Sequence, residues 1–276
     1  MRCSPVAALA FRVVAIWTIG KLLAGWPCCR MSEATVASVL EAFELPPAAR
    51  VDRRIPKTAL IDHGATRKPD ARLVDSGIAR LDWLAELSPA TVAIPARGDP
   101  PAPAVNILCL TPNGPPPLRL LELIHRAIPA PIVLLIADDA PRLSLAPRRL
   151  GEDGRTLVTE AVVLSPPLPP PAGFLRSLPI SGLPQLDIGA LYDGLVVRVE
   201  AWIAARLSDT AFRLPLSLAE AVARREALAQ WRLADAAWQE AARAARREKR
   251  LGQAVALGEV ARQKRLALQA LVGGLA

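Results

Sequence analysis

The stretch Leu118–Ile136, LRLLELIHRAIPAPIVLLI, decides the fold class of this chain. In its first half the large apolar residues recur at helical spacing, which predicts a short amphipathic helix over Leu118–Ala127 that ends before Pro129. Its second half, Ile132–Ile136, has no polar residue, which is typical of a strand buried on both faces. A helix followed at once by such a strand predicts a compact core in which helices pack on a sheet.

Further strands are expected on both sides of this stretch. Before it, Thr91–Ile94 and Val105–Thr111 have strand composition, and the loop between them, Arg97–Pro103, is expected to be too charged and too rich in proline to pack. After it, Arg142–Ala146 alternates like a strand with one solvated face, and Thr156–Leu164 follows as the second strand of a hairpin. This order of elements predicts a mixed β-sheet with helices packed on it.

Helices are expected in two further parts of the body. Arg53–Leu60 is interpreted as an extended entry that leads into a short helix near Lys57. Pro69–Leu87 is predicted to form one helix, because its large apolar residues recur at spacings that fit one helical face. Leu186–Leu207 shows the same kind of spacing and is predicted to be a second helix.

The chain changes character at Leu216. Leu218–Arg250 contains neither proline nor glycine and is rich in strong helix formers, with Ser217 as the expected N-cap. The seam positions of a coiled coil are predicted at Ala227, Trp231, Ala234, Trp238, Ala241 and Ala245. We interpret the C-terminal segment as an antiparallel helical hairpin with its turn within Arg250–Gln253, and one long helix bent at Gly252 is the alternative. The predicted fold is therefore α+β, followed by a coiled-coil-like hairpin.

The net charge of +8 is unevenly distributed along the 276 residues. Residues 1–30 have four basic side chains and no acidic one, residues 31–216 have 19 basic and 20 acidic ones, and residues 217–276 have 11 basic and six acidic ones. The middle of the chain is therefore balanced, and the excess lies at the two ends. We expect a non-core extension at residues 1–30, an α/β globular domain at 31–212 and a basic helical hairpin at 213–276.

The N-terminal extension does not have the pattern of a targeting segment. It lacks the clean apolar region and cleavage site of a signal peptide and the length of a membrane span. We interpret it as an artefact of start-site choice, with Met31 as the start; a degenerate export signal and a disordered arm are the alternatives. Three of the four cysteines lie in it, and Cys109 stands alone in a predicted buried strand. The positions of the cysteines fit neither a disulfide framework nor a zinc site. The cytoplasm is therefore the expected compartment.

Four short motifs stand out along the chain: Arg54-Ile-Pro-Lys57, the helix and strand within Leu120–Ile136, Leu191–Ala201 and the charged run Arg246–Leu251. Together they resemble a known bacterial family, domain of unknown function 4391. Where the family usually has an acidic residue before its basic-Ala-Ile-Pro segment, this chain has His125. The resemblance implies an accessory subunit that acts beside a helicase or DNA methyltransferase in a restriction-like or phage-defence system, and it carries over no catalytic residue.

Candidate catalytic and metal-binding residues are few. Asp138, Asp139 and Glu160 could form a nuclease metal site if the fold brought them together, but a solvated turn is the simpler interpretation of the aspartate pair. His63 and His125, with a lone cysteine, are too few for a zinc site. His125 is expected to be half-buried at a helix C-terminus, where a cation would be favourable. No catalytic residue, metal or cofactor is therefore predicted.

A basic cluster near the hairpin turn is the strongest sign of a partner. Its members are Arg243, Arg246, Arg247, Lys249 and Arg250. They could contact phosphates, but Glu240 and Glu248 lie among them, and a solvated face or a protein-docking face would have the same composition. We predict a non-enzymatic accessory protein with a protein partner and without a membrane. The alternatives are a divergent metal-dependent nuclease and a protein that binds DNA directly through the hairpin.

Overall fold

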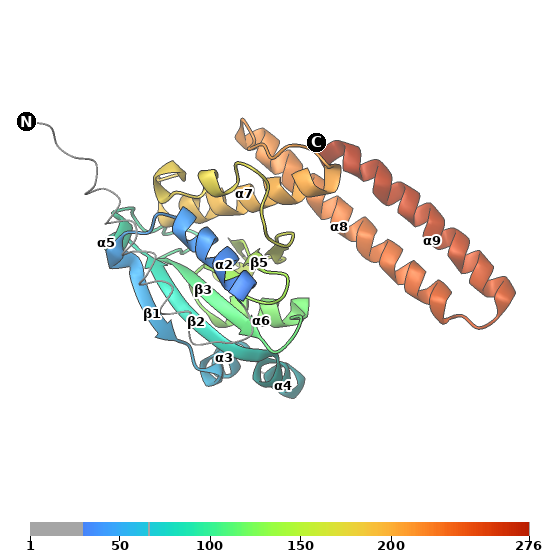
Figure 1. Cartoon of the computed structure of the whole chain (residues 1–276), viewed down its shortest axis with the longest axis horizontal. Coiled ribbons are helices and arrows are strands. Elements are labelled where there is room, and N and C mark those ends of the chain that lie inside the picture. The colour runs from blue at the N-terminus through green and yellow to red at the C-terminus, as the bar shows by residue number, and fades with distance from the viewer. Residues whose placement is uncertain (1–29, 66, 276) are drawn as a thin grey trace, which may run out of the picture.

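A six-stranded mixed sheet forms the centre of the protein, whose computed structural model describes residues 30–65 and 67–275 (Figure 1). Its strand order is β1 (Arg50–Arg54), β2 (Ile78–Leu87), β3 (Val105–Pro112), β4 (Ile132–Ile136), β5 (Arg142–Leu145) and β8 (Val163–Leu164). Only β3 and β4 are parallel, and helix α6 (Leu118–Ala127) connects them; the other neighbours are antiparallel. The predicted helix at Leu118–Ala127, the strand at Ile132–Ile136 and the α+β class are confirmed.

Helices cover both faces of the sheet. On one face α3 (Lys57–Gly64), α4 (Lys68–Gly77) and α6 enclose one apolar core, and on the other α2 (Arg30–Ala42) and α7 (Ile188–Ser208) enclose a second (Figure 1). Strand β4 contributes to both, because alternate side chains of a strand point to opposite faces. The expected extension, residues 1–30, lies outside the described residues apart from Arg30, the first residue of α2.

The prediction of one helix over Pro69–Leu87 was wrong in its second half. The helix ends at Gly77, and Ile78–Leu87 is strand β2, which pairs with β1 and β3. Its register shifts twice, between Ile78 and Arg80 and between Trp83 and Ala85. Each bulge moves the following side chains to the other face, so the buried residues of β2 do not alternate. Their spacing imitates a helix, and pairing with two neighbours overrides that local signal.

The segment before β3 also differs from the prediction. Residues Pro89–Val92 form the short helix α5, not a strand, because the Ser88 side chain caps it and Thr91 bonds back to the Ser88 N–H at 2.8 Å. The loop that follows does pack. Arg97 donates to Asp187 at 2.9 Å and to Asp193 at 2.9 Å, and Ala102 is buried. The loop is thus attached to the beginning of α7.

The predicted strands at Arg142–Ala146 and Thr156–Leu164 do belong to a paired region, but the pairing is divided between two sheets. β5 pairs with β8 within the main sheet, whereas β6 (Arg148–Leu150) pairs with β7 (Leu157–Thr159) in a small sheet of two strands. β5 has no solvated face, contrary to the prediction. Leu143 and Leu145 enter the core beneath α7, and Ser144 on the opposite face bonds to His125 of α6 at 2.9 Å.

His125 is fully buried and not half-buried, and it does not carry the expected positive charge. Burial lowers its pKa to about 3, with a smaller contribution from the nearby Arg148. The cation that binds the C-terminus of α6 is Arg148, whose guanidinium donates to the main-chain carbonyls of His125, Ile128 and Pro129, while Arg126 of the last turn is exposed. A residue that lies 20 positions beyond Ile128 in the sequence therefore completes the end of this helix.

Helix α7 confirms the prediction for Leu186–Leu207 and connects the sheet to the rest of the chain. Asp187 caps it by accepting the N–H of Ala190 at 2.7 Å. Near the N-terminal end of α7, the buried Tyr192 hydroxyl donates to the carbonyl of Ile132 at 3.0 Å and accepts the N–H of Ala146 at 2.8 Å. One side chain thereby holds α7 against both β4 and the end of β5.

Two long antiparallel helices, α8 (Leu218–Arg247) and α9 (Leu251–Val272), form the C-terminal hairpin and extend away from the sheet (Figure 1). We call this pair of helices the arm. Its turn lies at Glu248–Arg250, slightly before the predicted position, and the single bent helix is wrong. The Glu248 carboxylate accepts the N–H of Arg250 at 2.8 Å, close to the N-terminus of α9. Gly252 lies inside α9 and does not make the turn.

Short 3-10 helices complete the described structure. They are η1 (Pro47–Ala49), η2 (Leu175–Ser177), η3 (Ile180–Gly182) and η4 (Gly273–Leu275). The last of them returns the chain to the base of the arm, where Leu275 is buried in the core beneath α7. The buried guanidinium of Arg198 holds η2, η3 and α7 together by donating to the carbonyls of Ser177, Gly182 and Gly194 at 2.6, 2.8 and 2.9 Å.

Candidate functional site

The base of the arm is joined to the globular body by buried contacts. Leu228 of α8 is 1% exposed and belongs to the core beneath α7, and Trp231 packs against the same core. Beside them, Arg225 donates to both carboxylate oxygens of the buried Glu200, at 2.9 and 3.2 Å. Burial raises the pKa of Glu200, although the paired Arg225 opposes that change. The arm is therefore held at a defined place on α7.

Beyond its base, the arm is held together by its own seam. The six predicted seam residues are all buried or half-buried, and from α9 the residues Ala261 and Leu268 are buried opposite them. Trp238 is half-buried in this seam, one heptad beyond Trp231. The two tryptophans thus have different surroundings: Trp231 also contacts the core of the body, whereas Trp238 is not among the residues packed against it.

At its far end the arm carries the five basic side chains singled out in the sequence: Arg243, Arg246, Arg247, Lys249 and Arg250. We call them the basic tip. All five are exposed, and none of them forms an ion pair or a side-chain hydrogen bond with a described residue. Their charges are therefore available to a partner, because unpaired guanidinium and ammonium groups bind carboxylates and phosphates.

Most of the exposed large apolar side chains lie on the arm or just before it. Ten large apolar side chains among the described residues are well exposed, and eight of them lie between Leu216 and Leu266. The eight are Leu216, Leu218, Val222, Leu233, Leu251, Val255, Val260 and Leu266. Within α9 the spacing of Leu251, Val255 and Leu266 places them on one side of the helix. Each arm helix thus has apolar residues outside the seam, as in a helix that is buried in a larger assembly.

The three carboxylates of the nuclease hypothesis do not meet. Asp138 follows the C-terminal end of β4, where it accepts the N–H of Ala140 at 3.1 Å and pairs with Arg142 at 3.3 Å. Glu160 lies toward the opposite end of that strand and pairs with Arg149 at 3.7 Å. Over residues 30–65 and 67–275, no group of three His, Cys, Asp or Glu residues is arranged to hold a metal ion.

The other single residues considered in the sequence are also separate from one another. His63 is exposed on α3, whereas His125 is buried on the inner side of α6. Cys109 is buried in β3, as predicted, and burial raises the pKa of its thiol to about 12. A thiol that stays protonated is a poor nucleophile, so Cys109 acts as a small core residue.

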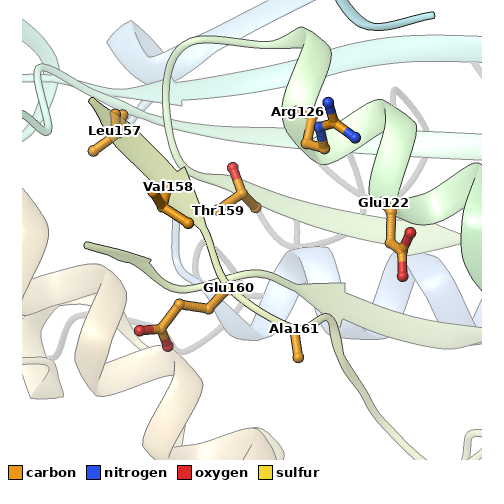
Figure 2. Close-up of a pocket in the computed structure, with 7 residues that line it drawn as sticks. All are labelled: Glu122, Arg126, Leu157, Val158, Thr159, Glu160 and Ala161. Atoms are coloured by element: carbon orange, nitrogen blue, oxygen red, sulfur yellow. The ribbon is translucent and has the colours of Figure 1, made fainter. Parts of the chain in front are cut away.

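A half-open hollow of about 560 Å³ lies between α6 and the small two-stranded sheet. Figure 2 shows Glu122 and Arg126 on α6 and the run Leu157–Ala161 opposite them, with the carboxylate of Glu160 pointing away from Glu122. Glu122 is paired with Arg119 at 3.2 Å. The sequence contained no signal for this hollow, because it forms between two segments about 35 positions apart.

No helix among the described residues has both the length and the apolar composition that crossing a membrane requires. A model of the family described as Domain of unknown function (DUF4391) matches residues 43–263, which confirms the resemblance seen in the sequence motifs. The match includes the whole sheet, α7, α8 and the first half of α9. No curated protein and no solved structure matches the chain.

Proposed function

The chain belongs to the family of domain of unknown function 4391, and from this premise we propose that it is a non-enzymatic accessory protein that acts by binding a larger protein. The observation that carries the proposal is the concentration of exposed apolar side chains on the arm. The body encloses its own two cores, so it does not need the outer surfaces of the arm for folding. Exposed apolar surface of this kind is typical of a protein–protein interface.

The arm also indicates the chemistry of its partner. Exposed apolar residues on both helices, with charged residues between them, fit a partly apolar groove, and the basic tip fits acidic side chains at the end of that groove. We propose that the partner is the helicase or the DNA methyltransferase of the same locus, in the cytoplasm, within a restriction-like or phage-defence system. The sequence resemblance supports this choice of partner, and the two properties of the arm support the mode of binding.

Co-expression with a helicase and with a DNA methyltransferase taken from the gene neighbourhood of this chain tests the proposal. The tagged wild-type chain should co-elute with one of them in size-exclusion chromatography. The variant Leu251→Glu/Val255→Glu should lose the partner, because two carboxylates replace apolar contacts of α9. The matched control Leu118→Glu/Leu186→Glu changes two exposed leucines of the body and should retain it. Co-elution of the arm variant at the wild-type level, or of neither protein with the wild type, would contradict the proposal.

A second candidate function is direct binding of duplex DNA by the basic tip, which the five unpaired side chains favour. The variant Arg246→Glu/Arg247→Glu/Arg250→Glu reverses three of these charges without breaking an ion pair. It should elute from a duplex-DNA column at lower salt than the wild type. Unchanged retention at low salt would reject this candidate and leave protein docking as the role of the tip.

A further inference from the structure

A second basic surface lies on the body, on the side that carries β1, α3 and α4 and away from the arm (Figure 1). Residues 50–72 have seven basic and three acidic side chains, whereas the remaining body residues, 31–49 and 73–216, have 12 basic and 17 acidic ones. The near-neutral total of the body therefore conceals a separation of charge. A local excess of this kind produces a positive potential even when the whole domain is balanced.

The centre of this surface is β1, the outermost strand of the main sheet. Arg50, Arg53 and Arg54 are exposed, and none of their side chains forms an ion pair or hydrogen bond with a described residue. Arg67, Lys68 and Arg72, in and just before α4, are exposed as well. We call the three arginines of β1 the basic edge. Other arginines of the body, such as Arg97, Arg119 and Arg198, are held by internal acceptors.

We propose that the basic edge binds the phosphate backbone of duplex nucleic acid. Guanidinium groups with no internal partner can donate two parallel hydrogen bonds to one phosphate. Strand geometry places Arg50 and Arg54 at most about 13 Å apart, because the bulge between them shortens the strand, and a duplex presents more than one phosphate over such a length. The surface has no row of exposed aromatic residues for stacking on unpaired bases, so a duplex is a better ligand than a single strand.

The shape of β1 argues against an acidic peptide that adds to the sheet as a further strand. The pairing of β1 with β2 shifts register between Arg50 and Arg53, and Asp52 has a φ of 49°. A bulged and charged edge strand is a poor template for another strand, because its free N–H and C=O groups are not evenly spaced. Phosphates do not require that regular spacing, since they contact the side chains only.

Fluorescence anisotropy of a short labelled duplex, with the full-length chain over a series of salt concentrations, tests the proposal. The edge variant is Arg50→Ala/Arg53→Ala/Arg54→Ala. The matched control is Arg155→Ala/Arg176→Ala/Arg206→Ala, which removes three exposed arginines that have no ion pair elsewhere on the body. Both variants lower the net charge by three, so a difference between them depends on the position of the charges.

The edge variant should bind the duplex about tenfold or more weakly at low salt, and the slope of log Kd against log salt should fall by about two to three. The control should stay within about twofold of the wild type, because it removes no phosphate contact. Replacing the same three arginines with lysine should retain most of the salt dependence, because the charges remain. The melting temperature should be unchanged in all three variants, because the altered side chains have no internal partners.

The proposal is overturned if the edge variant binds like the control, or if the wild type does not bind the duplex at low salt. It is also overturned if the wild type binds polyglutamate, the edge variant does not, and the two proteins bind the duplex with the same affinity. That result would identify an acidic protein as the partner. The edge variant leaves the basic tip unchanged, so duplex binding by the tip would persist in it, and only a loss caused by the edge substitutions supports the proposal. The co-elution experiment uses substitutions in α9 only, so the two proposals can fail separately.

Discussion

The body and the far end of the arm use the same residue types in opposite ways. In the body, Arg148 and Arg198 are largely buried, and each donates to three main-chain carbonyls. On the arm, the basic tip has no partner among the described residues, and leucine and valine side chains face solvent. In the interior of the body, charged side chains are therefore satisfied by internal acceptors, whereas the far end of the arm displays charged and apolar groups that no described residue satisfies.

The largest expected effect belongs to the body. Arg198→Met removes the donor for three carbonyls in or near the core, and we expect the free energy of unfolding to fall by about 3–5 kcal/mol. Urea denaturation followed by circular dichroism measures this change. Arg206→Met, on the exposed side of the same helix, is the control and should cost no more than about 0.5 kcal/mol. Equal effects of the two variants would show that Arg198 does not organise the segments around it.

The second expected effect is a pH dependence of the body. The pKa of His125 is lowered from 6.5 to about 3 in the folded state, so below pH 6.5 the unfolded chain takes up a proton that the folded chain does not. Above pH 6.5 His125 is neutral in both states and does not reduce stability. As the pH falls from 6.5 toward 3, protonation of His125 in the unfolded chain progressively lowers the free energy of unfolding. Between pH 6.5 and 4.5 the loss should be about 2 kcal/mol. His125→Gln should reduce this slope in urea titrations, and an unchanged slope would contradict the assignment.

The third effect compares the two tryptophans of the arm directly. Trp231 contacts the core of the body and Trp238 lies in the seam, so Trp231→Ala should lower the free energy of unfolding by about 2–3 kcal/mol and Trp238→Ala by about 1 kcal/mol. Denaturation curves of the two variants provide the measurement. A larger loss for Trp238 would mean that the seam, and not the contact with α7, maintains the arm.

The smallest effect on stability is expected for the outer surface of the arm. Leu251→Glu/Val255→Glu should change the free energy of unfolding by less than about 1 kcal/mol, because both side chains face solvent. Thermal and urea unfolding measure this effect on the same sample that is used for partner binding. Loss of the partner with retained stability would identify a docking surface, whereas strong destabilisation would show that these residues hold the arm together.

Local sequence was informative where one short segment contains its own signals. The helix at Leu118–Ala127 and the strand at Ile132–Ile136 have the predicted bounds, because periodicity defines both and proline separates them. Ser217 begins α8 as predicted, accepting the N–H of Glu220 at 3.1 Å. In these places the tertiary structure agrees with the local preference.

The failures occurred where the decisive partner lies far away in the chain. β2 looked helical because two bulges hide its alternation, and only its pairing with β1 and β3 makes it a strand. The loop at Arg97 packs because its partners, Asp187 and Asp193, lie 90 and 96 positions later. His125 is neutral because Ser144 and the surrounding core remove it from water.

The two candidate surfaces, the basic tip and the basic edge, also differ in whether local sequence reveals them. The basic tip could be located in the sequence because the charges lie within a few helical turns of one another, and helical periodicity alone predicts that most of them are exposed. The basic edge could not be located, because counting charges over the whole body averaged its excess with the acidic residues elsewhere. Which charges are neutralised by internal partners depends on contacts between distant segments.

The fold class, the family and the long helices of the arm could be predicted from the amino-acid sequence. Each of these follows from periodicity, composition or motifs within short segments, which no distant residue needs to complete. The order of the strands was visible only in the tertiary structure. The same is true of which cations bind internal acceptors and which apolar side chains stay exposed to water. These properties depend on burial and pairing, and the free energy of either is set by groups that the fold brings together from distant parts of the chain.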